Sequence, residues 1–422
     1  MFERPTGGER ALLVHVSFSQ LRDTDELNEL KLLAISAGAE VIDILHLKRN
    51  SPHAKYFLGT GQADHIAQLI QHHVIEVVII NHNLSPAQER NLERLWQCRV
   101  IDRIGLILAI FAKRARTHEG KLQVELAQLA HLSTRLVRGW THLERQKGGI
   151  GMRGPGETQL ETDRRLLGQR MSTIRQRLQK VRGARQQGRK KRKKQAMPTV
   201  SLVGYTNAGK STLFNQLAHS TVYAADQLFA TLDPTLRQIS LKKYGEIVLA
   251  DTVGFIRDLP HELIAAFKAT LDETKEADLL LHIVDAHDND NRNYCEQVNL
   301  VLEEIGAAHI PQLLVYNKID LSDRPAHLER DSRGQVRAVW VSATNDLGMD
   351  LLKAAICERL SQDFVYKTIT LKPEHAYVRA KLYARNVVHG EKINQEGIIT
   401  LEIGLPQWEY EKLLQDLDDT LG

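Results

Sequence analysis

The second half of the chain carries four short polar segments whose residue types bind nucleotides. In the first, an apolar run at residues 199–203 leads into Gly204-Tyr205-Thr206-Asn207-Ala208-Gly209-Lys210-Ser211-Thr212. Glycines let backbone N–H groups converge on phosphate oxygens at the N-terminus of a helix, which we expect over residues 211–218. Lys210 can reach the β- and γ-phosphates, and the Ser211 hydroxyl can bind Mg²⁺. This segment predicts a phosphate-binding loop.

The second segment predicts contacts to the metal and to the γ-phosphate. It follows the apolar run 247–250 and consists of Asp251-Thr252-Val253-Gly254. Asp251 would hold Mg²⁺ mostly through water, and the backbone N–H of Gly254 would contact the γ-phosphate. Phe255 comes next, where Ras-like enzymes carry a glutamine that orients the attacking water. Because a phenyl ring cannot hydrogen-bond to water, we expect slow hydrolysis until a partner orders the switch loop or supplies a polar group.

The last two segments predict recognition of guanine. Residues 313–316 lead into Asn317-Lys318-Ile319-Asp320, and residues 338–341 lead into Ser342-Ala343-Thr344. The Asp320 carboxylate can accept both N1–H and the exocyclic amine of guanine, a donor pair that adenine lacks. The Lys318 stem would lie along the base, and a backbone N–H after Ser342 would reach the guanine O6. Four such segments, each after a strand, predict an α/β domain with the site at one edge of its sheet.

A segment without regular period separates the first two motifs and predicts a mobile loop that senses the nucleotide. A threonine there could complete Mg²⁺ coordination only when the γ-phosphate is bound. We favour Thr231, with Thr235 as the weaker alternative. Lys210, Thr231 and Gly254 are the expected catalytic residues. The expected GTP contacts in this loop are Phe229, Ala230, Thr231, Leu232 and Asp233.

Around this site the chain divides into four expected parts. Residues 196–363 form the GTPase domain with its parallel sheet. Residues 1–112 form a small α/β domain, because strand patterns at 11–16, 41–47, 77–81 and 99–101 alternate with helix patterns at 26–36, 62–73 and 86–97. Residues 364–422 form a small α+β domain with strands expected at 368–371, 376–383 and 398–403 and a helix at 407–417.

The remaining part, residues 113–195, predicts a long antiparallel helical hairpin with a basic linker. Leucines and other apolar residues recur at 4-3 spacing in two stretches, 122–143 and 167–181. The glycine-rich segment 148–156 between them cannot continue a helix and would form the tip. A hairpin that packs only on its own domain is the alternative to one that reaches a large partner.

Positive charge is concentrated in this hairpin. Residues 153–194 carry a net charge of +12 in a chain of net charge +4, which leaves −8 elsewhere. A run of one sign on an otherwise acidic protein suits neutralisation of phosphates, whereas the simpler interpretation is a solvated linker. The pattern does not separate RNA from DNA. The expected nucleic-acid contacts are Lys147, Arg153, Arg189, Lys190, Lys191, Arg192, Lys193 and Lys194.

Composition excludes several other classes. Apolar residues make up 42% of the 422 residues and charged residues 26%, which is typical of globular proteins. No apolar run approaches the ~18 residues that a membrane span needs, and no signal peptide is recognised. Cys98, Cys295 and Cys357 lie far apart, which argues against a zinc site or a disulfide framework. We expect a cytoplasmic monomer without a membrane span.

The stretch Gly148–Arg165, together with the segments FATLDPT and DTVGF, resembles the HflX family of ribosome-associated GTPases over essentially the whole chain. The resemblance implies a Mg²⁺-dependent GTP/GDP switch that binds the large ribosomal subunit and its rRNA, not DNA, and splits stalled ribosomes under stress. It also implies that the hairpin tip reaches toward the peptidyl-transferase region. ATP binding by the N-terminal region, ascribed to some members, has no phosphate loop to support it in residues 1–112.

Two other functions compete with this one. The chain could be mainly an RNA-binding module that remodels the ribosome, with a GTPase that serves only release. A tRNA-modification GTPase would share the nucleotide motifs. Such enzymes need a catalytic cysteine or a cofactor pocket, and the three cysteines of this chain lie outside any such motif.

Overall fold

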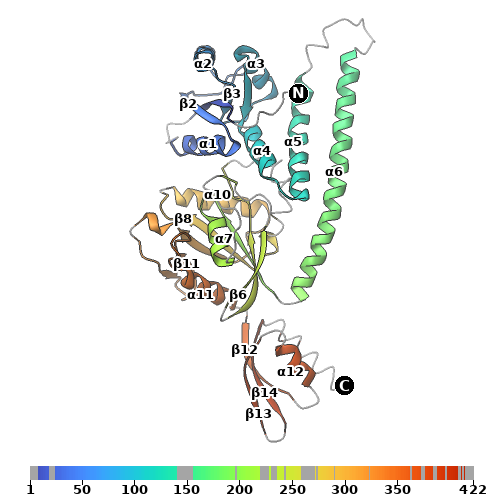
Figure 1. Cartoon of the computed structure of the whole chain (residues 1–422), viewed down its shortest axis with the longest axis vertical. Helices are drawn as coiled ribbons and strands as arrows, with labels where there is room; N and C mark the ends of the chain where they lie inside the picture. Colours follow the sequence, from blue (N-terminus) through green and yellow to red (C-terminus); the bar gives the residue numbers. More distant parts are fainter. Residues whose placement is uncertain are drawn as a thin grey trace. The chain divides into compact units, whose positions relative to one another are not determined.

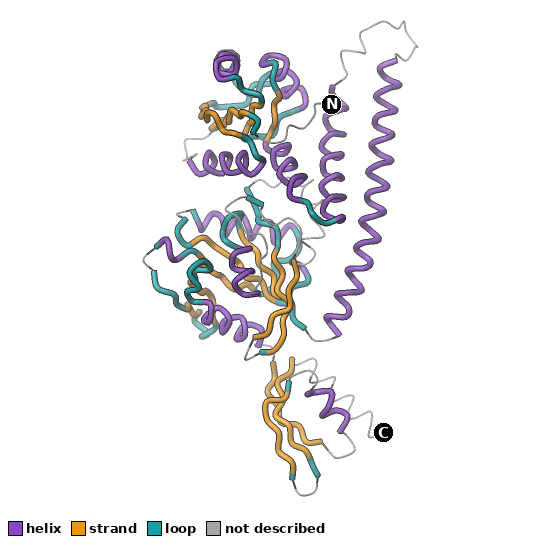
Figure 2. The backbone as a smooth tube through the Cα atoms, in the orientation of Figure 1, coloured by secondary structure: helices purple, strands orange, loops and turns teal. Residues whose placement is uncertain are grey.

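The fold is described from a computed structural model of the chain (Figures 1 and 2). The residues described are 8–18, 24–139, 155–194, 197–218, 228–229, 235–241, 244–257, 271, 274–288, 290–322, 324–361, 364–371, 376–383, 387–394, 397–406, 410 and 413. Within these ranges no helix combines the length and the apolar character that crossing a bilayer requires.

The chain divides into two compact units. The first contains residues 1–185 together with two short segments from the middle of the sequence, 223–233 and 256–270. The second contains the remaining residues. Of these two segments, the structure describes residues 228–229 in the first and residues 256–257 in the second.

A four-stranded parallel sheet in the order β2-β1-β3-β4 organises the first unit. The central strand β1 is apolar and buried over nearly its whole length, as expected for a strand covered on both faces. The sequence predicted this sheet and three of its helices, but not α4. The elements are β1 (Arg10–Ser17), α1 (Thr24–Ala37), β2 (Glu40–Lys48), α2 (Thr60–His73), β3 (Val77–Ile80), α3 (Pro86–Trp96), β4 (Arg99–Asp102) and α4 (Arg103–Arg114).

Side-chain caps fix where the helices of this unit begin. Ser85 accepts a hydrogen bond from the backbone N–H of Gln88, whose side chain accepts from the N–H of Ser85, so the predicted N-cap is confirmed. Asp102 caps α4 by accepting from the Gly105 N–H at 2.8 Å. The other Asp102 oxygen accepts a hydrogen bond from the Arg135 guanidinium at 2.7 Å, and this partly buried contact links the next helix to the end of β4.

Helices α5 (His118–Gly139) and α6 (Pro155–Lys194) confirm the predicted hairpin. Leu122, Ile174 and Leu178 are buried between them, and Arg170 pairs with Glu125 across the hairpin. Helix α6 begins at Pro155 and thus includes the end of the glycine-rich segment. The backbone of the basic run 189–194 continues α6 instead of forming a separate linker.

A seven-stranded mixed sheet in the order β10-β11-β9-β8-β5-β7-β6 forms the centre of the second unit. Its five inner strands run parallel, and β6 and β10 are antiparallel to their neighbours at the two edges. The strands are β5 (Thr199–Gly204), β6 (Thr235–Leu241), β7 (Gly245–Asp251), β8 (Leu279–Asp285), β9 (Gln312–Asn317), β10 (Leu328–Arg330) and β11 (Val336–Trp340).

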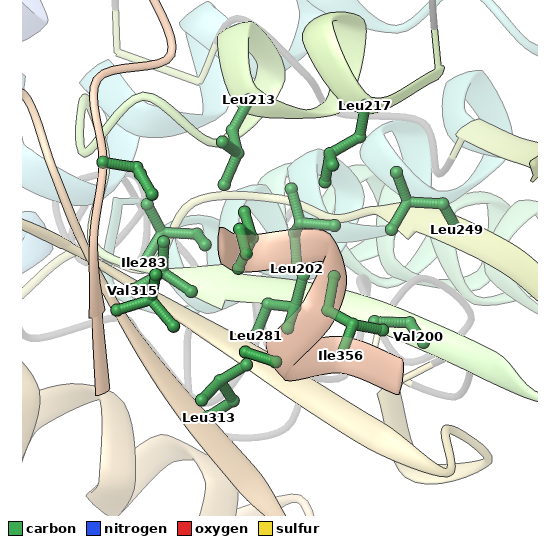
Figure 3. Close-up of a cluster of buried hydrophobic side chains, with 14 of the residues drawn as sticks. Val200, Leu202, Leu213, Leu217, Leu249, Leu281, Ile283, Leu313, Val315 and Ile356 are labelled. Atoms are coloured by element: carbon green, nitrogen blue, oxygen red, sulfur yellow. The ribbon is translucent and has the colours of Figure 1, made fainter. Parts of the chain in front are cut away.

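Helices α7 (Lys210–Ala218) and α11 (Met349–Leu360) pack on this sheet through one shared core (Figure 3). Leu213 and Leu217 of α7 and Ile356 of α11 meet strand residues such as Leu202 and Leu281. Helix α10 (Asn291–Glu304) contacts β5 and β8. Burial of these apolar side chains fixes the strands, and therefore the loops at their carboxyl ends.

The C-terminal part corrects one prediction. Residues 376–383 were expected to form a strand but form helix α12 (Ala376–Tyr383), because Val378 and Leu382, four positions apart, are the buried side chains on one helical face. They cover the antiparallel sheet β12-β14-β13, made of β12 (Phe364–Leu371), β13 (Val388–Ile393) and β14 (Ile399–Pro406). Most of the expected helix 407–417 lies outside the described residues.

The small core of the hairpin gives a prediction about stability. Replacing Ile174, which is fully buried, by Ala should destabilise the packing of α5 on α6 by about 2 kcal/mol. Amide hydrogen exchange in both helices should then accelerate about 30-fold. Leu166→Ala on the same helix is the control, since Leu166 is 52% exposed. Equal acceleration in both variants would contradict the assigned packing.

Candidate nucleotide-binding site

The phosphate loop runs from the end of β5 to the start of α7, and two glycines are required by its shape. Gly204 has φ 149°, and a Cβ there would lie 2.3 Å from the carbonyl oxygen of Ile283. Gly209 has φ 90°, and a Cβ there would lie 2.2 Å from Nδ2 of Asn317. Side chains therefore cannot be accommodated at either position, and the backbone of the loop approaches its neighbours closely.

Lys210 lies beneath this loop and is buried. Its Nζ donates to the carbonyl oxygens of Gly204 at 3.0 Å and Tyr205 at 2.5 Å. The pKa of Lys210 is lowered to about 8, because burial, the largest cause, and the charge of Lys318 both lower it more than the charge of Asp251 raises it. An anion next to this amine would stabilise the charged form, as a phosphate group does.

Two oxygen-bearing side chains meet beside the lysine. Ser211 Oγ donates to Oδ2 of Asp251 at 2.9 Å, and Asp251 is fully buried at the end of β7. A hydroxyl and a carboxylate in contact form part of a hard-oxygen set that fits Mg²⁺. The Thr206 hydroxyl is buried as well and lacks a hydrogen-bond partner among the described residues, where a phosphate oxygen would supply one.

The backbone of Gly254 and Phe255 lies directly on the phosphate loop. Thr206 N–H donates to the Phe255 carbonyl at 2.7 Å, and Phe255 N–H donates to the Gly204 carbonyl at 3.1 Å. A Cβ on Gly254 would lie 2.9 Å from Nζ of Lys210. The Phe255 side chain is only 2% exposed, so it belongs to the packing and not to the solvent-facing part of the site.

The Asn317 side chain connects the phosphate loop to the loops after β9 and β11, which are expected to hold the guanine base. Its Nδ2 donates to the Ala208 carbonyl at 3.0 Å, and its Oδ1 accepts from the Ala343 N–H at 3.0 Å. The side chain therefore links the ends of β9 and β11 to the phosphate loop. One residue at the carboxyl end of a central strand thus brings the first, third and fourth predicted motifs together.

Asp320 and Ser342 form the edge of the base site. Ser342 Oγ donates to Oδ1 of Asp320 at 2.5 Å and accepts from the Asn345 N–H at 3.1 Å. Asp320 is exposed, whereas Ser342 is fully buried. The serine therefore holds one oxygen of an exposed carboxylate, to which two guanine donors could bind.

The predicted residues outside the four motifs belong to the expected switch loop and the hairpin, and the structure describes only some of them. Phe229, with φ 55°, belongs to the first unit, where its ring packs on that of Phe111 at a centroid distance of 4.6 Å. Thr235 is the first residue of β6. Ala230, Thr231, Leu232 and Asp233, as well as Lys147 and Arg153, lie outside the described residues. For Arg189, Lys190, Lys191, Arg192, Lys193 and Lys194 the structure describes the helical backbone alone.

Two groups of paired residues were not predicted from the sequence. In the first unit, Arg103 donates to the Arg257 carbonyl at 3.0 Å, and the Arg257 side chain pairs with Glu26 at 2.5 Å. In the second unit, Asp285 pairs with Lys318. Asp285 ends an apolar run in the sequence, as the motif residues do, and this was the available signal.

The pKa of Lys210 predicts a pH-dependent affinity. The free protein loses the Lys210 proton near pH 8, and phosphate binding favours the charged amine. The affinity for GTP therefore has its full value below that pH and falls above it. The dissociation constant of GTP should rise about tenfold from pH 7 to 9. Fluorescence titration measures this. Lys210→Met should bind more weakly and without this slope, and the same slope in that variant would contradict the assignment.

Models of known families match most of the chain. Residues 24–112 match a family described as GTP-binding GTPase N-terminal, and residues 114–192 match its middle region. Residues 199–318 match a family described as 50S ribosome-binding GTPase. Among solved structures, a complex of SsGBP with GDP is similar at 25% identity with a TM-score of 0.48, covering 84% of this chain and 99% of that one.

Curated relatives match over nearly the full length. The GTPase HflX of Escherichia coli (strain K12) is 56% identical over 414 residues, which are 98% of this chain and 97% of the relative. The GTPase HflX of Magnetococcus marinus is 46% identical over 391 residues, covering 91% and 90% of the two chains. With these matches and the nucleotide motifs on the strand ends, the chain belongs to the HflX family of GTPases.

Proposed function

We propose that this GTPase is a nucleotide-controlled factor that binds the large (50S) ribosomal subunit and splits stalled 70S ribosomes under stress. The observation that carries the proposal is Phe255, which follows the γ-phosphate motif with its side chain buried. A GTPase without its own water-orienting side chain hydrolyses slowly and depends on a partner for acceleration. Membership of a ribosome-binding GTPase family supports the ribosome as that partner.

The proposed nucleotide contacts follow the geometry of the motifs. Residues 204–212 hold the phosphates, with the Lys210 amine between the β- and γ-phosphates. The N–H of Gly254 meets the γ-phosphate, and Asp320 with the loop 342–344 recognises guanine. Residues 229–233 are the proposed switch loop. Lys210, Thr231 and Gly254 act on the transferring phosphoryl group.

Mg²⁺ is the proposed metal, and Ser211, Thr231 and Asp251 would hold it, the last through water. When bound, it neutralises charge that develops on the phosphates during hydrolysis. The contact between Ser211 and Asp251 supports this set, because the hydroxyl is already held beside the carboxylate. Thr231 joins the set only in the GTP state, which makes its loop the reporter of hydrolysis.

The hairpin is the proposed ribosome-binding part, and its tip would reach toward the peptidyl-transferase region. Its second helix ends in six consecutive basic residues, 189–194, which suits contact with the phosphates of rRNA. Lys147 and Arg153 at the tip are proposed to contribute. We infer no DNA partner and a monomeric cytoplasmic protein. We also propose that the chain consists of four parts, with boundaries after residues 112, 195 and 363.

A second candidate is an RNA-binding module whose GTPase serves only release from the ribosome. The observation that favours it is the concentration of charge, since residues 168–194 carry twelve basic side chains and no acid. Under this alternative, binding to RNA alone would remodel the ribosome. The two candidates differ in whether an intact Lys210 is needed for splitting.

The experiment follows phosphate release from GTP, and from ATP in parallel, with and without large ribosomal subunits. We expect turnover that is selective for GTP and that rises at least about tenfold when the subunits are added. Turnover that ignores the subunits would contradict the ribosome as the activating partner. Equal turnover of ATP would contradict recognition of guanine.

The same preparation separates the two candidates. Splitting of 70S ribosomes is followed by light scattering with the wild-type chain and with Lys210→Ala. We expect Lys210→Ala to lose nucleotide-dependent splitting, because the lysine charge holds the phosphates. Splitting that is unchanged in Lys210→Ala would support the RNA-binding module instead.

A further inference from the structure

We propose that Asp285 is a positioning residue for guanine nucleotides, which acts by holding the Lys318 side chain across the base site. Asp285 ends β8 and belongs to none of the four nucleotide motifs. The inference rests on the role proposed above for Lys318. It adds a fifth strand end to the site, and it explains how the lysine is held in place.

The carboxylate of Asp285 is oriented by its own loop. Asp285 lies opposite Asn317 in the parallel pairing of β8 with β9, and the Ala286 N–H donates to the Asn317 carbonyl at 2.8 Å. Asp285 Oδ1 accepts from the His287 N–H at 3.0 Å. The remaining oxygen, Oδ2, lies 2.8 Å from Nζ of Lys318. One oxygen is thus fixed by the backbone, and the other receives the lysine.

Lys318 has a backbone that directs its side chain over the phosphate loop. Its φ of 66° lies in the left-handed region, which non-glycine residues rarely adopt. The Ile319 N–H then bonds to the Val341 carbonyl at 3.3 Å, so the turn is held from the neighbouring strand. Cε of Lys318 lies 4.0 Å from the position of a Cβ on Gly209. The stem therefore crosses the loop, and Asp285 holds its far end.

Asp285 has two opposing effects on nucleotide binding. It restricts a side chain with four rotatable bonds, so that less rotamer freedom is lost when the base arrives. It also neutralises a cation near the phosphates, and that cation lowers the pKa of Lys210. The Lys318 and Asp285 side chains are 24% and 23% exposed, so solvent and salt screen the charge effect. Orientation therefore dominates, and removing the carboxylate weakens binding.

The test is a double-mutant cycle on nucleotide affinity. Dissociation constants of fluorescently labelled GTP and GDP are measured for the wild-type chain, Asp285→Asn, Lys318→Met and the double variant. We expect Asp285→Asn to weaken both nucleotides equally, by about five- to tenfold, because the two share the base. In the Lys318→Met background, Asp285→Asn should raise the dissociation constants by less than about twofold.

Asp350→Asn is the matched control, because it removes the same charge from an exposed acid in the first turn of α11. We expect its affinities to equal those of the wild-type chain. If Asp285→Asn lowers the nucleotide affinity just as much in the Lys318→Met background, the proposal is overturned, since Asp285 would then act without the lysine.

Two other outcomes separate this inference from the proposed function. If Lys318→Met weakens binding while Asp285→Asn matches the control, the role of Asp285 alone is wrong. If Lys318→Met leaves the affinity unchanged, the role of Lys318 in the proposed nucleotide site is wrong, and the inference fails with it.

Discussion

The candidate nucleotide site depends on the hydrogen bonds of the Asn317 carboxamide. This carboxamide donates to the phosphate loop at Ala208 and accepts from the loop after β11 at Ala343, at 3.0 Å in both cases. Its backbone carbonyl also accepts from Ala286 after β8. Loops from four strands are thereby held at one edge of the sheet, which is where parallel sheets place ligand-binding groups. Gly209 must lack a side chain because the carboxamide occupies that space.

Burial at this edge also determines the electrostatics. The inner strands and the helices α7 and α11 exclude water from the base of the phosphate loop, so the Lys210 amine is desolvated and its pKa falls to about 8. Asp251, fully buried, partly offsets this effect. A charged amine in these low-dielectric surroundings would attract a phosphate group more strongly than the same amine in water. The apolar core of the GTPase domain thus contributes to the chemistry of the site.

The fold and the motifs could be predicted to different extents. The strands of the sheet and the loops at their carboxyl ends could be predicted together. An apolar run that is followed by glycine, aspartate or asparagine marks both the strand and the ligand-binding loop after it. The strand predicted for residues 376–383 was wrong, because Val378 and Leu382 fit one face of a helix as well as one face of a strand. In the structure they are buried on one face of a helix. The pair Asp285–Lys318 could not be predicted, since it depends on strand order, which places β8 beside β9. Helix α4 was missed because an apolar run of its length does not by itself distinguish helix from strand.

The nucleotide preference of Asp320→Asn tests whether Asp320 recognises guanine. Xanthine replaces the exocyclic amine of guanine by a carbonyl, which an asparagine amide can donate to and a carboxylate cannot. We expect this variant to lose GTP affinity by at least about 100-fold and to gain affinity for XTP. Ser342→Ala, which removes only the hydroxyl that orients Asp320, should keep the preference for GTP. If Asp320→Asn binds GTP like the wild-type chain and does not bind XTP, Asp320 does not recognise guanine.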